Sequence, residues 1–122
     1  MIIRLAVLFI LIASPSFAAT YYVDYVGGSD SNAGTQALPF KHCPGDDNAT
    51  DTADITTLSA GDTVYFKGGV EYIGRIDVDW SGTEGNPITY DGNTAGTWGT
   101  GRAIIDGDQT HNAGFTSFVS VA

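Results

Sequence analysis

The chain has 122 residues, with 14 acidic against 5 basic side chains, 16 glycines and one cysteine. So few basic residues exclude a nucleic-acid-binding surface, which needs clustered Lys and Arg, and one cysteine excludes an internal disulfide framework. Residues 1–18 combine Arg4, an uncharged apolar run over 5–13, and small residues at Ser16 and Ala18. This is the layout of a secretory signal peptide, too short for a membrane span. We therefore expect a secreted, periplasmic or cell-surface protein whose leader, residues 1–18, is cleaved near Ala18.

Cleavage leaves residues 19–122, a segment of 122 − 18 = 104 residues with a net charge of 4 − 14 = −10. That charge makes anionic lipid a poor partner, so no membrane contact is expected after cleavage. Short apolar and aromatic clusters separated by glycine predict an all-β fold. The acidic stretch 41–60 is expected to be a surface loop with a short helix. The expected strands cover 20–24, 63–67, 75–80, 87–91, 102–106 and 115–121.

The expected strands recur at intervals that indicate a solenoid. The interval from Val64 to Ile88 is 88 − 64 = 24, and that from Ile76 to Ile104 is 104 − 76 = 28. A period of roughly 20 to 30 residues built from short strands and turns is a solenoid signature. A hairpin sandwich is the alternative. It is disfavoured because no clean two-residue hairpin turn joins the expected strands.

An ordered series of motifs runs through residues 19–122. It comprises residues 21–24, 28–35, 39–40, 60–66, 68–69, 81–89 and 104–107, with Gly-Asp-Thr-Val at its centre. This series resembles the N-terminal region of secreted right-handed parallel β-helix proteins of the pectate-lyase-like superfamily. The resemblance implies an N-terminal cap and the first two to three coils of a parallel β-helix. Family members commonly carry an amphipathic cap helix before the Gly-Asp-Thr-Val motif, whereas here an acidic, cysteine-containing loop fills that interval.

The resemblance also implies a function. It indicates an exported carbohydrate-active protein, a polysaccharide lyase or a glycoside hydrolase, whose catalytic residues lie outside this segment. The alternative is a non-catalytic glycan-binding adhesin or a phage tailspike-like structural protein, because the same opening precedes these proteins. Extracellular polysaccharide is the expected partner. The charge of −10 favours a neutral glycan, or an acidic one bridged by calcium.

Residues 75–80 carry the clearest alternation in the chain, with Arg75, Asp77 and Asp79 on the expected solvent face. Carboxylates two positions apart on a strand lie about 7 Å apart, which suits a shared calcium ion. The resemblance implies calcium at Asp77 and Asp79 and a functional role for Arg75, in binding substrate or as a base. A solvated face with a local ion pair is the alternative.

Two further features are candidates for ligand binding. Asp30 and Asn32 place oxygen ligands at alternate positions before Gly34, as at the start of a calcium loop. The bidentate acid that completes such a loop is missing, so an Asx-stabilised turn is the alternative. Trp98, in a loop rich in Gly and Thr, is the aromatic residue expected to be most exposed for stacking on a sugar ring. Packing in the core or the cap is the alternative.

The remaining reactive side chains are expected to be structural. Cys43 is either a free buried thiol or the half of a disulfide with something outside this chain. His42 and His111 are expected in loops, because neither lies at a metal-ligand spacing from another ligand. Residues 115–121 form an apolar strand pattern without a polar cap, which leaves an edge that should pair. We therefore expect a truncated N-terminal portion, with further coils or an oligomer at that edge.

Overall fold

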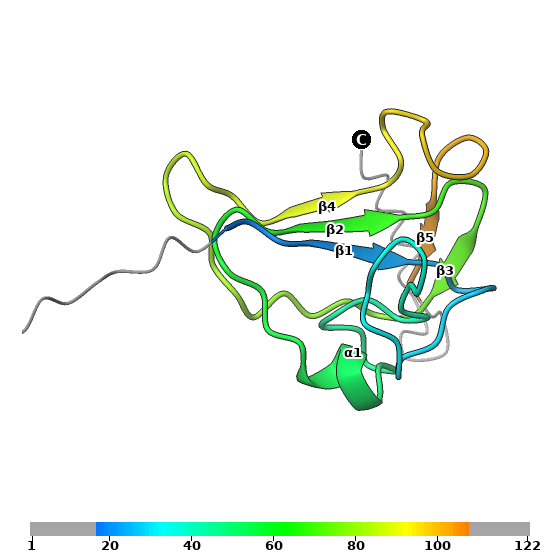
Figure 1. The fold of residues 1–122 in the computed structure, drawn as a ribbon, viewed down its shortest axis with the longest axis horizontal. Coiled ribbons are helices and arrows are strands. Elements are labelled where there is room, and N and C mark those ends of the chain that lie inside the picture. The colour runs from blue at the N-terminus through cyan, green and yellow to red at the C-terminus, as the bar shows by residue number, and fades with distance from the viewer. Residues whose placement is uncertain (1–16, 108–122) are drawn as a thin grey trace, which may run out of the picture.

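The computed structural model describes residues 17–107, and in it the chain is mostly β. All paired strands run parallel and form two small sheets, one of three strands and one of two. Figure 1 shows the three arrows of the first sheet stacked in the order β1, β2, β4, with β3 and β5 beside their ends. The elements are β1 (Thr20–Val23), α1 (Asp51–Ile55), β2 (Thr63–Phe66), β3 (Glu71–Ile73), β4 (Thr89–Asp91) and β5 (Ile104–Asp106).

Long crossovers join the strands of each sheet. Val64 of β2 pairs with Tyr21 of β1 on one side and with Tyr90 of β4 on the other. Glu71 of β3 pairs with Ile104 of β5, and β4 lies between these two strands in the sequence. Parallel strands need such crossovers, because a tight hairpin can join only antiparallel neighbours. The described sheets are therefore incompatible with the hairpin sandwich. None of the helices in residues 17–107 has the length and apolar character that a membrane crossing needs.

The core is built from both sheets and from the irregular segment between β1 and β2. Val64 and Phe66 are both buried and lie two positions apart on β2, so they share the inner face of this strand. Cys43 is a free thiol buried in the same core, and burial raises the pKa of that thiol well above its ordinary value. The buried position agrees with the first of the two alternatives expected for Cys43, and a disulfide with something outside this chain stays a prediction. The core cluster consists of Val23, Cys43, Leu58, Val64, Phe66 and Tyr72.

A loop that ends at Phe40 covers the outer edge of the first sheet. The amide of Tyr22 donates to the carbonyl of Gly34 at 2.8 Å, and the amide of Phe40 donates to the carbonyl of Tyr22 at 2.9 Å. The amide of Asp24 donates to the carbonyl of Phe40 at 2.9 Å, and the Phe40 side chain is fully buried. An open edge strand invites pairing with another chain, so these hydrogen bonds protect β1.

The prediction of a strand at 75–80 is wrong. The structure places β3 earlier, at Glu71–Ile73, and gives 75–80 only an isolated antiparallel bridge between Ile76 and Asp46. Val78 is 58% exposed, so the expected apolar face is not buried along its length. Charged and apolar residues can also alternate in an extended loop. Only hydrogen bonds to a neighbouring strand distinguish a strand from such a loop. The short helix expected within 41–60 is confirmed as α1, and the strand expected at 115–121 lies outside the described residues.

A pair of glycines turns the chain between β2 and β3. The amide of Gly68 donates to the carbonyl of Trp98 at 2.9 Å, and the amide of Gly69 donates to the carbonyl of Arg102 at 3.0 Å. A Cβ atom on Gly68 would overlap the carbonyl oxygen of Gly101. The corner after β2 therefore packs directly on the segment after β4. The two strands that precede these segments, β2 and β4, are paired in the same way.

Candidate functional site

Three aromatic side chains gather on the outer face of the first sheet. They are Tyr22 of β1, Tyr65 of β2 and Trp98 of the loop after β4, and we call them the aromatic patch. Tyr22 and Tyr65 are register partners that alternate with core residues, so they point away from the core. The ring centroids lie 5.7 Å apart for Tyr22 and Tyr65, 5.3 Å for Tyr22 and Trp98, and 6.3 Å for Tyr65 and Trp98. All three side chains are half-buried, and none belongs to the hydrophobic cluster of the core.

Asn93 holds the loop that carries Trp98. This buried residue has a φ of 66°, in the left-handed region that Asn enters more readily than most residues. Its Oδ1 accepts from the Trp98 amide at 3.1 Å and from the Tyr65 hydroxyl at 3.0 Å. Its Nδ2 donates to the carbonyl of Gly101 at 2.7 Å. One side chain therefore ties both ends of the loop to the sheet and fixes Trp98 against Tyr65.

An ion pair borders the aromatic patch. Lys67 Nζ lies 2.7 Å from Asp24 Oδ2 and 5.7 Å from the centroid of the Trp98 ring. Burial raises the pKa of Asp24, but hydrogen bonds from Lys67 and from the amides of Gly27 and Val26 outweigh burial and leave that pKa below its ordinary value. Asp24 is therefore charged at neutral pH and compensates the charge of Lys67, so the border of the patch carries no net charge from this pair.

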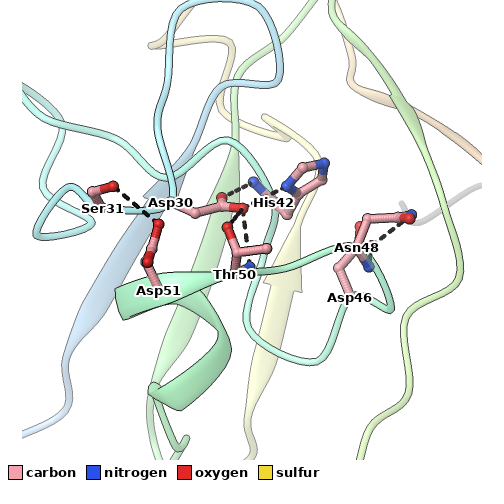
Figure 2. Close-up of polar contacts among 7 residues, drawn as sticks. All are labelled: Asp30, Ser31, His42, Asp46, Asn48, Thr50 and Asp51. Atoms are coloured by element: carbon pink, nitrogen blue, oxygen red, sulfur yellow. Dashed lines mark hydrogen bonds and ion pairs between the residues drawn. The ribbon is translucent and has the colours of Figure 1, made fainter.

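A second polar cluster surrounds Asp30 (Figure 2). Its Oδ1 accepts from the His42 amide at 2.8 Å. Its Oδ2 lies 2.7 Å from His42 Nδ1 and accepts from the amide and hydroxyl of Thr50 at 3.1 and 3.2 Å. Burial raises the pKa of Asp30, but the hydrogen bonds from His42 and Thr50 prevail and lower it overall. The carboxylate joins two loop segments to the start of α1, where the Ala53 amide donates to the Asp30 carbonyl at 3.0 Å.

The first calcium candidate is part of this cluster. Both carboxylate oxygens of Asp30 already accept hydrogen bonds from protein donors, so a calcium ion would have to displace them. Asn32 uses its Nδ2 to donate to the carbonyl of Pro39 at 2.8 Å. Calcium needs six to eight oxygen ligands, and this pair alone does not supply them. The geometry is that of a hydrogen-bonded turn, and calcium at this point stays a prediction.

The second calcium candidate lies in the irregular segment after β3 rather than on a strand. Arg75 donates to Asp77 Oδ2 at 2.5 Å and lies 3.4 Å from Asp47 Oδ1, and all three side chains are largely exposed. Asp79 is exposed as well. Among residues 17–107 no three His, Cys, Asp or Glu side chains come together as a metal site. The structure thus joins Arg75 to Asp77, and calcium at Asp77 and Asp79 stays a prediction.

Sequence reasoning missed the roles of Asn93 and His42. Asn93 follows Asp91-Gly92, and this stretch of sequence indicates only a turn. His42 was expected in a loop, which the structure confirms, but its contact with Asp30 across 12 residues has no periodic signature. His111 lies outside the described residues.

No protein-family model and no curated protein matches the chain. Among solved structures, the crystal structure of a GH136 lacto-N-biosidase from Eubacterium ramulus, in its native form, matches 73% of this chain at 23% identity, with a TM-score of 0.48. The matched part spans 12% of the length of that protein.

Proposed function

We propose that residues 19–122 form the N-terminal cap and the first two to three coils of a right-handed parallel β-helix. The observation that carries this proposal is the parallel, in-register stacking of β1, β2 and β4 next to that of β3 and β5. After the cap, the intervals between register partners are 90 − 64 = 26 and 104 − 71 = 33, close to the period of a solenoid. The order of motifs that resembles pectate-lyase-like proteins supports the same assignment.

The parent protein, on this proposal, is an exported carbohydrate-active protein, a polysaccharide lyase or a glycoside hydrolase. Its catalytic residues lie in later coils. The aromatic patch supports a glycan partner, because an aromatic ring offers an apolar face on which a sugar ring can stack. Trp98, expected from the sequence to stack on sugar, lies in this patch with Tyr22 and Tyr65.

Charge narrows the class of glycan. Lys67, the cation nearest to Trp98 among the described residues, is already compensated by Asp24. The net charge of −10 after removal of the leader repels a polyanion. The proposed partner is therefore a neutral glycan, or an acidic one for which calcium supplies the missing positive charge.

A polysaccharide panel tests the proposal on the full-length gene product, exported with its own leader. Release of unsaturated, ultraviolet-absorbing oligosaccharides identifies a lyase, and release of new reducing ends without that absorbance identifies a hydrolase. Each assay is run with calcium and with a chelator. Saturable binding without cleavage would replace the enzyme with the adhesin or tailspike-like alternative. Neither binding nor cleavage of any neutral or acidic glycan would overturn the carbohydrate proposal.

A further inference from the structure

Three carboxylates are buried in the described part of the chain. Asp24, Asp30 and Asp62 are 4%, 7% and 5% exposed. A buried carboxylate is costly unless a cation and hydrogen bonds compensate it. Asp24 has Lys67 and Asp30 has His42, each at 2.7 Å. Within residues 17–107, Asp62 has no Lys, Arg or His side chain at ion-pair distance.

Two backbone amides fill the place of a cation at Asp62. The amide of Ser59 donates to Oδ2 at 2.8 Å, and the amide of Ala19 donates to Oδ1 at 2.7 Å. The second contact joins residues 43 positions apart. The carbonyl of Ala19 accepts from the amide of Thr63 at 2.8 Å, so both backbone polar groups of Ala19 are held beside β2.

Ala19 is also the point at which the chain enters the fold. Phe17 is 86% exposed and Ala18 is exposed, whereas Ala19 is half-buried and β1 begins at the next residue. Of the described residues, a cut between Ala18 and Ala19 would therefore remove only exposed ones. The sequence places the expected leader cleavage at this same bond, after the small residues Ser16 and Ala18.

We propose that Asp62 is the receptor for the mature N-terminus, and that cleavage of the Ala18–Ala19 bond gives this carboxylate its counter-charge. This rests on the export part of the proposed function. A signal peptidase adds water across the bond, so Ala18 leaves as a carboxylate and the Ala19 nitrogen takes up protons to become an ammonium group. The contact to Asp62, until then between a neutral amide and a carboxylate, becomes one between two ionised groups, so the attraction of opposite charges is added to the hydrogen bond.

Among residues 17–107, Tyr21 is a titratable group that the charge of Asp62 affects. Burial and the charge of Asp62 raise the pKa of Tyr21 above its ordinary value. An N-terminal ammonium with a carboxylate partner also loses its proton above its ordinary pKa of about 8, so its contribution to stability is lost at alkaline pH. Both groups titrate on the alkaline side, so a pH scan alone does not separate them. The test therefore uses substitution and extension of the chain.

The experiment compares four exported proteins made from the full gene. Two carry the natural junction and two carry one extra alanine after Ala18, so that cleavage at the same Ala18 leaves the extra residue in front of Ala19. Each junction is made with Asp62 and with Asp62→Asn, and mass spectrometry establishes every N-terminus before the proteins are compared. We expect the extension to lower the Tm by roughly 2–4 °C in the Asp62 proteins, the shift that about 1 kcal/mol gives in a protein of about 150–250 residues, and by much less in the Asp62→Asn proteins.

Equal shifts in both pairs, or no shift in either, would overturn the inference. If Asp62→Asn does not fold, selective acetylation of the mature N-terminus replaces it. Acetylation removes the positive charge and should lower the Tm by a similar amount, and an unchanged Tm contradicts the inference. Cleavage at a different bond would contradict the proposed role of Asp62 but would still agree with export of the protein. A leader that stays attached contradicts export itself.

Discussion

Trp98 and Tyr22 meet edge to face, with ring centroids 5.3 Å apart and an interplanar angle of 86°. The two residues come from the loop after β4 and from β1, and β4 and β1 are the two outer strands of the first sheet. A contact across all three strands is available only on the outer face, because the inner face is filled by the core. This arrangement makes the aromatic patch a continuous surface rather than three separate rings.

Trp98→Ala should weaken glycan binding about two- to twelvefold, because one aromatic stacking contact is worth about 0.5–1.5 kcal/mol. Titration of the full-length product with the glycan that it binds best measures the effect. Ile55→Ala is the matched control, because Ile55 is an exposed apolar residue on α1 and is not part of the patch. Equal affinity of the Trp98 variant and the parent would remove the patch from the binding surface.

Asn93→Ala should lower the free energy of unfolding by about 2 kcal/mol, because the hydrogen bonds of a buried side chain are lost and the φ of 66° becomes unfavourable. Asn93→Gly loses the same hydrogen bonds but tolerates this φ, so it should be less destabilising. Urea unfolding compares both variants with Asn86→Ala, an exposed control. If Asn93→Ala unfolds like Asn86→Ala, Asn93 does not hold the loop.

Acid should destabilise the fold through Asp30. Hydrogen bonds in the folded state lower the pKa of Asp30, so its contribution is complete above the unfolded value of about 3.9 and is lost as the pH falls through the lower, folded value. Asp46, whose pKa is raised chiefly by burial, acts in the opposite direction and partly masks this loss.

Thermal unfolding at a series of acidic pH values, with Asp30→Asn and Asp79→Asn side by side, isolates the effect. Asp30→Asn should be less stable at neutral pH and should lose less stability on acidification. Asp79 is exposed, so Asp79→Asn should follow the parent. Parallel acid profiles for Asp30→Asn and the parent would show that Asp30 does not contribute in this way.

Gly68→Ala should cost at least about 2 kcal/mol, because the new Cβ atom would meet backbone atoms of Gly101 that cannot move freely. Gly107→Ala is the control, because no atom of residues 17–107 lies within 4 Å of the Cβ position there. Urea unfolding should show a clear loss for the first variant and little change for the second. Two equal midpoints would mean that the corner after β2 does not pack on the segment after β4.

Strands with one apolar face between glycine-rich turns could be predicted from the sequence. The strand expected at 63–67 is confirmed as β2, where Val64 and Phe66 are buried and alternate with half-buried neighbours. The same alternation led to a wrong prediction at 75–80. Alternation shows which side chains could share a face, but it does not show whether the backbone hydrogen-bonds to a neighbouring strand. It also missed β3 at Glu71–Ile73, a short strand that begins with an exposed acid and is stabilised by its partner β5.

The polar contacts could not be predicted, because each joins residues far apart in irregular segments. Asp30 lies 12 residues from His42, and Ala19 lies 43 residues from Asp62. Neither interval belongs to a helix or strand period, so only the folded backbone brings these groups together. The presence of Trp98 near a solvent-facing site could be anticipated from its Gly- and Thr-rich loop, whereas its tyrosine neighbours depend on the register of β1 and β2.

The most direct test of the central claim is an experimental structure of the full-length gene product. We expect further parallel strands to continue the stack beyond β4 and β5, so that both sheets become faces of one right-handed β-helix. Antiparallel strands on β4 or β5, or a fold in which the two sheets end without further coils, would contradict this claim.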